Sequence, residues 1–250
     1  MIPAKPARWA NIVFSKYLKR LMKRSFNSVQ LLGDVPDLVP DLPVLLLPNH
    51  STWWDGFFAY WLNKQLFQRP FYLLMLEREL KKYPFFRKVG AFGITQENPK
   101  SVIKTMAYTR SLLAMDSHPL ITIFPQGELL PNMRRPLGYK NGVERILQKY
   151  DGRVNVLPVA IRCEFLGKQL PDAHLLFGKN HVFCRDSFPG MQWLEEIEEH
   201  VLQDLSQQID TGEIGCNLLT AIPERSKDIS ITGNFSRDIE LLNKPVNLLK

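Results

Sequence analysis

The residues best suited to chemistry are His50 and Asp55, which lie in the stretch PNHSTWWDGFFAYWL at residues 48–62. On one continuous α-helix their side chains would point about 140° apart. They can therefore meet only if His50 lies in the turn after a strand and Asp55 in the first turn of the next helix. A carboxylate on one imidazole nitrogen fixes the tautomer and stabilises the imidazolium, so the other nitrogen is free to take a proton from a hydroxyl. The pair predicts a general base that activates a substrate hydroxyl.

The chain offers no obvious nucleophile of its own. It has no Gly-x-Ser-x-Gly elbow and no cysteine in a setting typical of a nucleophile. A histidine that caps a helix is a common structural feature, so the pair alone does not establish catalysis. The other histidines have no partner spacing, and we predict no metal site; they are His118, His174, His181 and His200.

Alternating strands and helices are predicted to position the pair. The apolar run at residues 44–50 stops at Pro48 and predicts a buried strand, and residues 52–67 predict a helix with Ser51 or Thr52 as its N-cap. Further strands are predicted at 70–76, 91–96, 119–128, 155–165 and 174–184, and further helices at 78–90, 98–116, 142–150 and 189–209. The alternation predicts an α/β fold, a single domain with a mixed, largely parallel sheet flanked by helices.

The basic residues are concentrated near the N-terminus. The net charge of the 250 residues is +7, and residues 1–33 account for all of it, through Lys5, Arg8, Lys16, Lys19, Arg20, Lys23 and Arg24. Apolar residues recur every three or four positions in residues 9–22, which predicts a basic amphipathic helix at the interface of an anionic membrane. A helix packed on its own domain with a solvated basic face is the alternative. Because the rest of the chain is neutral, we expect no nucleic-acid partner.

Three segments follow from these patterns: a membrane-association helix at residues 1–33, an α/β domain at 34–210 and a C-terminal extension at 211–250. Cys163, Cys184 and Cys216 are too few and too widely spaced for a disulfide framework, which indicates a reducing compartment. No apolar run reaches the roughly 18 residues that span a bilayer, and no cleavable signal pattern is present. We therefore expect a peripheral, monotopic protein on the cytoplasmic face of a membrane.

Several short blocks resemble those of the glycerolipid acyltransferases, the family of lysophospholipid and glycerol-phosphate acyltransferases. NHSTWWD at residues 49–55 resembles the family's Asn-His-x-x-x-x-Asp block, and FPQGE at 124–128 is similar to its Phe-Pro-Glu-Gly-Thr block. The segments at 77–95, 137–146 and 156–161 resemble the family's remaining blocks, and all occur in the family's order. The resemblance covers about residues 9–165.

The resemblance implies a reaction and a set of site residues. Family members move a fatty acyl group from a coenzyme A or acyl-carrier-protein thioester to the hydroxyl of a lipid acceptor, without a covalent acyl-enzyme and without a cofactor. Carried over, His50 is the general base and Asp55 its orienting partner. Substrate-binding roles are expected for Gln96, Pro125, Gln126, Gly127, Glu128, Arg134, Arg135 and Lys140. Backbone N–H groups around Gly127 are candidates for stabilising the tetrahedral oxyanion.

Two departures from the family pattern concern the acceptor. Gln96 occupies a position where the family often has an arginine that binds an acceptor phosphate, and an amide cannot replace that bidentate contact. Gln126 and Glu128 replace the usual glutamate and threonine. Arg134 and Arg135 could supply the missing positive charge, or could be a solvated pair. The acceptor therefore remains open among a lysophospholipid, glycerol phosphate and another lipid alcohol, such as a glycosylated one.

Two other classes of function stay open from the sequence. The altered FPQGE block is compatible with a lipid-binding or membrane-scaffolding protein on an inactive acyltransferase fold, although an intact His50–Asp55 pair argues against it. An acyl thioesterase that uses water as acceptor would also need no serine elbow. An acyl-thioester assay with and without lipid acceptors separates these readings.

Overall fold

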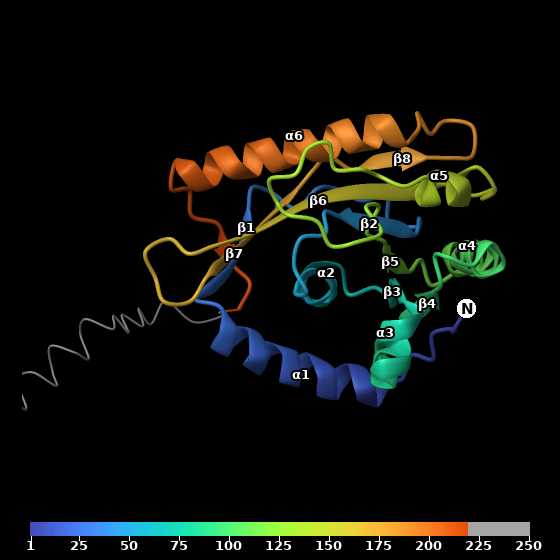
Figure 1. The fold of residues 1–250 in the computed structure, drawn as a ribbon, viewed down its shortest axis with the longest axis horizontal. Coiled ribbons are helices and arrows are strands. Elements are labelled where there is room, and N and C mark those ends of the chain that lie inside the picture. The colour runs from blue at the N-terminus through green and yellow to red at the C-terminus, as the bar shows by residue number, and fades with distance from the viewer. Residues whose placement is uncertain (220–250) are drawn as a thin grey trace, which may run out of the picture.

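The computed structural model describes residues 1–219, and a mixed sheet runs through this part of the chain (Figure 1). Its strand order is β4-β3-β5-β2-β6-β7-β1-β9, and β8 also pairs with β6. The strands are β1 Ser28–Leu32, β2 Val44–Pro48, β3 Phe71–Leu76, β4 Ala91–Ile94, β5 Leu120–Thr122, β6 Val154–Glu164, β7 Asp172–Phe177, β8 His181–Phe183 and β9 Cys216–Asn217. The run from β4 to β6 is parallel throughout, and β6 and β7 pair antiparallel. The predicted fold class is confirmed.

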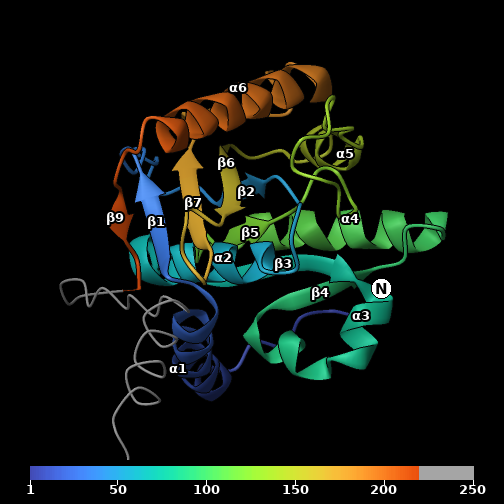
Figure 2. The ribbon, with the colours of Figure 1, turned by 60° about the vertical axis from the view of Figure 1, so that its left-hand side comes forward.

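Helices cover both faces of the sheet (Figures 1 and 2). They are α1 Arg8–Ser25, α2 Asp55–Leu62, α3 Glu77–Lys82, α4 Pro99–Leu113, α5 Gly142–Leu147 and α6 Met191–Asp210. Side chains of α1 and α2 form one apolar core with the sheet, and those of α4, α5 and α6 form the core on the opposite face. All five residues of β2 are buried, as expected for a strand at the centre of a sheet that is covered on both faces.

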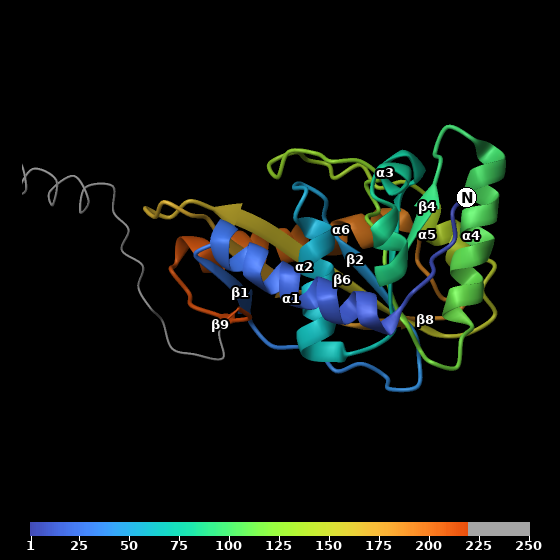
Figure 3. The ribbon, with the colours of Figure 1, turned by 90° about the horizontal axis from the view of Figure 1, so that it is seen from below.

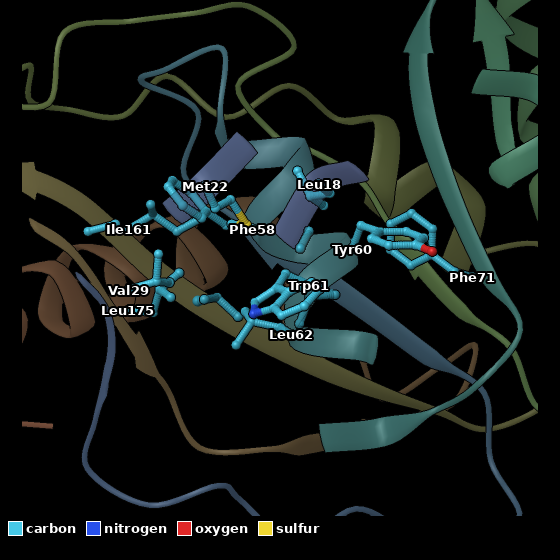
Figure 4. Packing of buried hydrophobic residues seen from close by; sticks show 14 of the residues in the cluster. Leu18, Met22, Val29, Phe58, Tyr60, Trp61, Leu62, Phe71, Ile161 and Leu175 are labelled. Atoms are coloured by element: carbon cyan, nitrogen blue, oxygen red, sulfur yellow. The ribbon is translucent and has the colours of Figure 1, made fainter. Parts of the chain in front are cut away.

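The N-terminal helix α1 has two apolar faces. One face packs into the core through Ala10, Phe14, Leu18 and Met22, and Figure 4 shows Leu18 and Met22 beside Phe58 of α2. Figure 3 shows α1 lying across α2. The second apolar face is exposed and consists of Trp9, Ile12, Val13 and Tyr17, each more than half accessible to solvent. Within residues 1–219, no helix has the length and apolarity needed to cross a bilayer.

The N-terminal segment also contributes a strand that the sequence reading missed. Strand β1 pairs in parallel with β7, and β9 adds to its other side in antiparallel. Residues 1–33, predicted as a membrane-association segment, thus also supply part of the core and of the sheet. The predicted C-terminal extension, residues 211–250, begins directly after α6 and includes β9, and residues 220–250 lie outside the described part of the chain.

Candidate active site

His50 and Asp55 meet across the turn that joins β2 to α2. The strand ends at Pro48 and the helix begins at Asp55, so the side chains approach each other although they are five residues apart. His50 Nδ1 lies 2.9 Å from Asp55 Oδ2. Asp55 is completely buried, whereas the side chain of His50 is about one-fifth exposed. The arrangement is the one that the spacing of the two residues requires.

The carboxylate of Asp55 is the centre of the turn. Its Oδ2 accepts hydrogen bonds from the backbone N–H groups of Ser51 at 2.7 Å and Thr52 at 2.8 Å, and its Oδ1 accepts from the hydroxyl of Thr52 at 2.6 Å. The helix α2 has Trp54 as its N-cap residue, without a side-chain cap of its own. The hydroxyl oxygen of Thr52 accepts the N–H of Trp54 at 3.2 Å, so Thr52 both binds Asp55 and satisfies a backbone group at the start of the helix.

A carboxylate at this position determines the tautomer of His50. Because the carboxylate only accepts, Nδ1 carries the hydrogen and Nε2 is the basic nitrogen. The thiol of Cys163 also lies near Asp55, and burial, followed by the charges of Asp55 and Glu164, raises its pKa to about 12. Cys163 is therefore a neutral neighbour of the pair, and not a thiolate nucleophile.

Neighbouring elements hold the backbone and ring of His50. The side chain of Asn49 bonds both backbone groups of Ile161 on β6, accepting from N at 2.7 Å and donating to O at 3.0 Å. The N–H of Leu130 donates to the carbonyl of His50 at 2.9 Å. The imidazole stacks on the ring of Phe124, with 4.0 Å between centroids. The imidazole is thus fixed by β6 on one side and by the segment after β5 on the other.

A cavity of about 1040 Å³ opens beside His50, at the carboxyl ends of the parallel strands. This edge is where ligands bind in open α/β sheets. Its apolar walls come from both helical and strand elements and include Phe14, Phe57, Leu73, Phe86, Val102 and Met106. The cavity is at the upper end of the size range of small-molecule sites, and it joins a base to a long apolar surface.

Most of the predicted substrate-binding residues line this cavity. They are Gln96, Pro125, Gly127, Glu128 and Lys140. Gln96 Nε2 donates to the carbonyl of Gly127 at 2.7 Å, and Lys140 Nζ lies 3.3 Å from Glu128 Oε1. Gly127 has a φ of +70°, and a Cβ there would lie 3.0 Å from Lys140, so only glycine fits this turn without strain.

Three predicted residues do not line the cavity. Gln126 is buried, and its side chain turns back to the N–H of His50. Arg134 and Arg135 lie on the exposed loop before α5, where Arg135 donates to the carbonyls of Asn132 and Arg134. The N–H of Gly127, a candidate for the oxyanion site, already donates to Phe124 O at 3.0 Å.

The structure also adds residues that the sequence reading did not assign to a site. Arg145 on α5 lines the cavity, and Phe124 supports the imidazole. Arg145 follows Lys140 by five residues on the segment that enters α5. Local spacing could not have suggested Arg145, because a separation of five residues does not place two side chains on one face of a helix. The stacking of Phe124 on His50 depends on two strands that are distant in sequence.

The chain matches the sequence profile of the family described as Acyltransferase over residues 30–162, more than half of its length. It belongs to this family and is an acyltransferase. No curated protein sequence matches it. Among solved structures it is similar to the crystal structure of the 1-acyl-sn-glycerophosphate (LPA) acyltransferase, PlsC, from Thermotoga maritima. That likeness has a TM-score of 0.53 and 16% sequence identity, covers 78% of this chain and 79% of that chain, and concerns the fold.

Proposed function

We propose that the protein transfers a fatty acyl group from a coenzyme A or acyl-carrier-protein thioester to the hydroxyl of a lipid acceptor, with His50 as general base. The observation that carries this proposal is the position of His50. Its Nδ1 is held by a buried carboxylate, while its ring borders a cavity with long apolar walls. A base next to such a surface suits a reaction in which both substrates carry hydrocarbon.

The reaction proceeds by direct attack of the acceptor. Nε2 of His50 removes the proton of the hydroxyl as its oxygen attacks the thioester carbonyl. The tetrahedral intermediate collapses by breaking the carbon–sulfur bond, and the imidazolium returns the proton to the departing thiolate. Asp55 stabilises the imidazolium that exists between these two transfers. The products are the acylated lipid and the free thiol, and the enzyme regains its starting state.

Charged side chains at the cavity suggest how polar parts of the substrates are held. Arg78, Lys140 and Arg145 line it together with Glu79, Glu97 and Glu128. Lys140 lies near Glu128 and Arg78 near Glu79, whereas Arg145 forms no ion pair with any residue of the described chain. Arg145 is thus the cation best placed for a phosphate of the thioester donor, since a guanidinium binds phosphate through two nitrogens.

The outer face of α1 is proposed to rest on an anionic membrane. Its exposed aromatic and aliphatic side chains point away from the protein's own core and are interspersed with the exposed cations Lys16, Lys19, Arg20, Lys23 and Arg24. The exposed aromatic residues also include Phe85, which contacts Trp9, and Tyr83 and Trp53, which line the cavity. Such a surface suits an interfacial protein on the cytoplasmic leaflet, which carries anionic lipids.

The proposal is tested by incubating the full chain with radiolabelled acyl-coenzyme A or acyl-carrier protein and a set of lipid alcohols, some with and some without a phosphate. Formation of a labelled lipid with release of one thiol per acyl group is expected. Release of free fatty acid at the same rate with and without acceptors would instead identify a thioesterase. No consumption of any thioester would identify a binding protein on this fold.

A further inference from the structure

The side chain of Gln126 belongs to the catalytic turn and not to the cavity wall. It follows Phe124 and Pro125 after β5, it is only 3% exposed, and its neighbours Pro125 and Gly127 line the cavity while it does not. Its Oε1 accepts the backbone N–H of His50. The side-chain oxygen is therefore occupied by the protein itself, which is the opposite of what a substrate-binding role requires.

The same short segment holds His50 at three separate points. Gln126 binds the backbone N–H of His50, the N–H of Leu130 binds its carbonyl at 2.9 Å, and the ring of Phe124 stacks on its imidazole. Asp55 provides the fourth contact through Nδ1. Both peptide groups that flank the Cα of His50 are thus fixed, and only the Nε2 side of the ring is left for a substrate.

We propose that Gln126 is a positioning residue for His50: its amide oxygen fixes the backbone of the base, and its neutrality adds no charge beside the imidazole. This inference rests on the proposed role of His50 as general base. A carboxylate would make the same hydrogen bond, because it also accepts from an N–H. It would, however, place a second negative charge near a ring that already contacts Asp55, and so would favour the protonated ring.

The ionisable groups around His50 define the background for this effect. Asp55 contacts the ring from α2, and Cys163 on β6 lies near Asp55. Glu198 on α6 is buried next to the backbone of Asn49, with burial raising its pKa to about 8. The pair of Glu128 and Lys140 borders the cavity, whose remaining charged residues are Arg78, Glu79, Glu97 and Arg145. All of these residues are present in both Gln126 variants.

Two substitutions separate the two parts of the proposal. Gln126→Glu keeps size and acceptor but adds a charge, and Gln126→Leu keeps approximate size but removes the acceptor. Gln203→Glu, on the exposed side of α6, is the control for a change in net charge. The full chain is labelled with ¹⁵N-histidine. The ring nitrogen signals of the five histidines are followed against pH, and those of His50 are assigned from their loss in His50→Ala.

The proposal expects the titration midpoint of His50 to rise by about one pH unit in Gln126→Glu, since a charge a few ångströms away in a partly buried site has an effect of that order. Gln203→Glu should match wild type.

In the transfer assay, the acid limb of the kcat profile against pH should move with the midpoint in Gln126→Glu. Gln126→Leu should lower kcat about 10–100-fold with little change in the KM of the acceptor, because a misplaced base slows the chemical step.

An unchanged midpoint in Gln126→Glu would overturn the proposal, as would a Gln126→Leu enzyme that keeps its kcat and loses affinity for the acceptor. If Gln126→Leu does not fold, the isosteric Gln126→Glu decides by itself. A wild-type protein that transfers no acyl group would contradict the proposed function. In that event the ¹⁵N titration still determines whether Gln126 controls the surroundings of His50.

Discussion

Asp55 Oδ2 lies 2.9 Å from Nδ1 of His50 and at the same time accepts the N–H groups of Ser51 and Thr52. One buried carboxylate oxygen thus shapes the turn and orients the imidazole. The conformation of the turn and the orientation of the imidazole therefore depend on the same atom, and a change at Asp55 should affect both.

Asp55→Asn should lower kcat by about 10²–10⁴-fold, because an amide can hold the imidazole in the wrong tautomer while retaining part of the turn. The KM of the acceptor should change little. Asp172→Asn is the matched control: Asp172 is also buried and accepts from Asn27 and Ser28, but it lies on β7 and does not line the cavity. Equal losses of activity in the two variants, measured on folded protein, would show that the effect at Asp55 is only structural.

Membrane binding should depend on the exposed face of α1. Ile12→Glu is expected to weaken binding to anionic vesicles by tenfold or more, because it removes apolar contact and adds repulsion. Ile103→Glu on α4 is the control, since Ile12 is 57% and Ile103 66% exposed. Co-sedimentation at low and high salt measures both. If the two variants bind alike, another surface of the protein contacts the membrane.

The stability of the fold should fall as the pH rises from about 4.5 towards 8, because of Glu198. Its side chain is fully buried, and burial raises its pKa from 4.5 to about 8, against the smaller lowering effects of the backbone groups of Asn49 and Val159. Between these values the unfolded chain releases the proton and the folded chain keeps it, so ionisation favours unfolding. A full proton difference corresponds to about 1.4 kcal/mol per pH unit.

Glu198→Gln should remove most of this slope and stabilise the protein at pH 9, whereas Glu196→Gln, exposed on the same helix, should leave the slope as it is. Urea unfolding at pH 5, 7 and 9 gives the required free energies. A wild-type stability that does not decrease over this range would mean that Glu198 is ionised in the folded protein.

Gln96 should govern the response to a phosphate on the acceptor. It lines the cavity and donates to Gly127 O, and an arginine there could keep that bond and offer further donors. We expect wild type to prefer the acceptor without a phosphate, and Gln96→Arg to raise kcat/KM for the phosphorylated partner about tenfold. Gln203→Arg controls for net charge. A strong preference of wild type for the phosphorylated acceptor would contradict this prediction. Arg145 would then be the first candidate for binding the phosphate.

The sequence was most informative where local signals decide the structure. The apolar run that stops at Pro48 and the five-residue spacing of His50 and Asp55 were enough to predict the turn on which both lie. Strand β1 was missed because its five residues pair with β7, some 140 residues later, and show little periodicity of their own. Parallel pairing of this kind depends on tertiary packing more than on local pattern.

The orientation of single side chains could not be predicted from the blocks. The position of Gln126 between Pro125 and Gly127 suggested a substrate contact, but the turn directs its side chain away from the cavity. Gly127 and Glu128 line the cavity, whereas Gln126 reaches the backbone of His50. Arg134 and Arg135 carried the charge expected of a phosphate site, yet their loop holds them outside the cavity.

The general-base role of His50 is tested most directly by the kcat of His50→Ala with the best pair of thioester and acceptor. His200→Ala, on the exposed side of α6, serves as control, and thermal unfolding verifies that both variants are folded. The account predicts a loss of about 10²–10⁴-fold for His50→Ala and none for His200→Ala. A folded His50→Ala enzyme whose kcat stays within about threefold of wild type would contradict the assignment of His50 as the base.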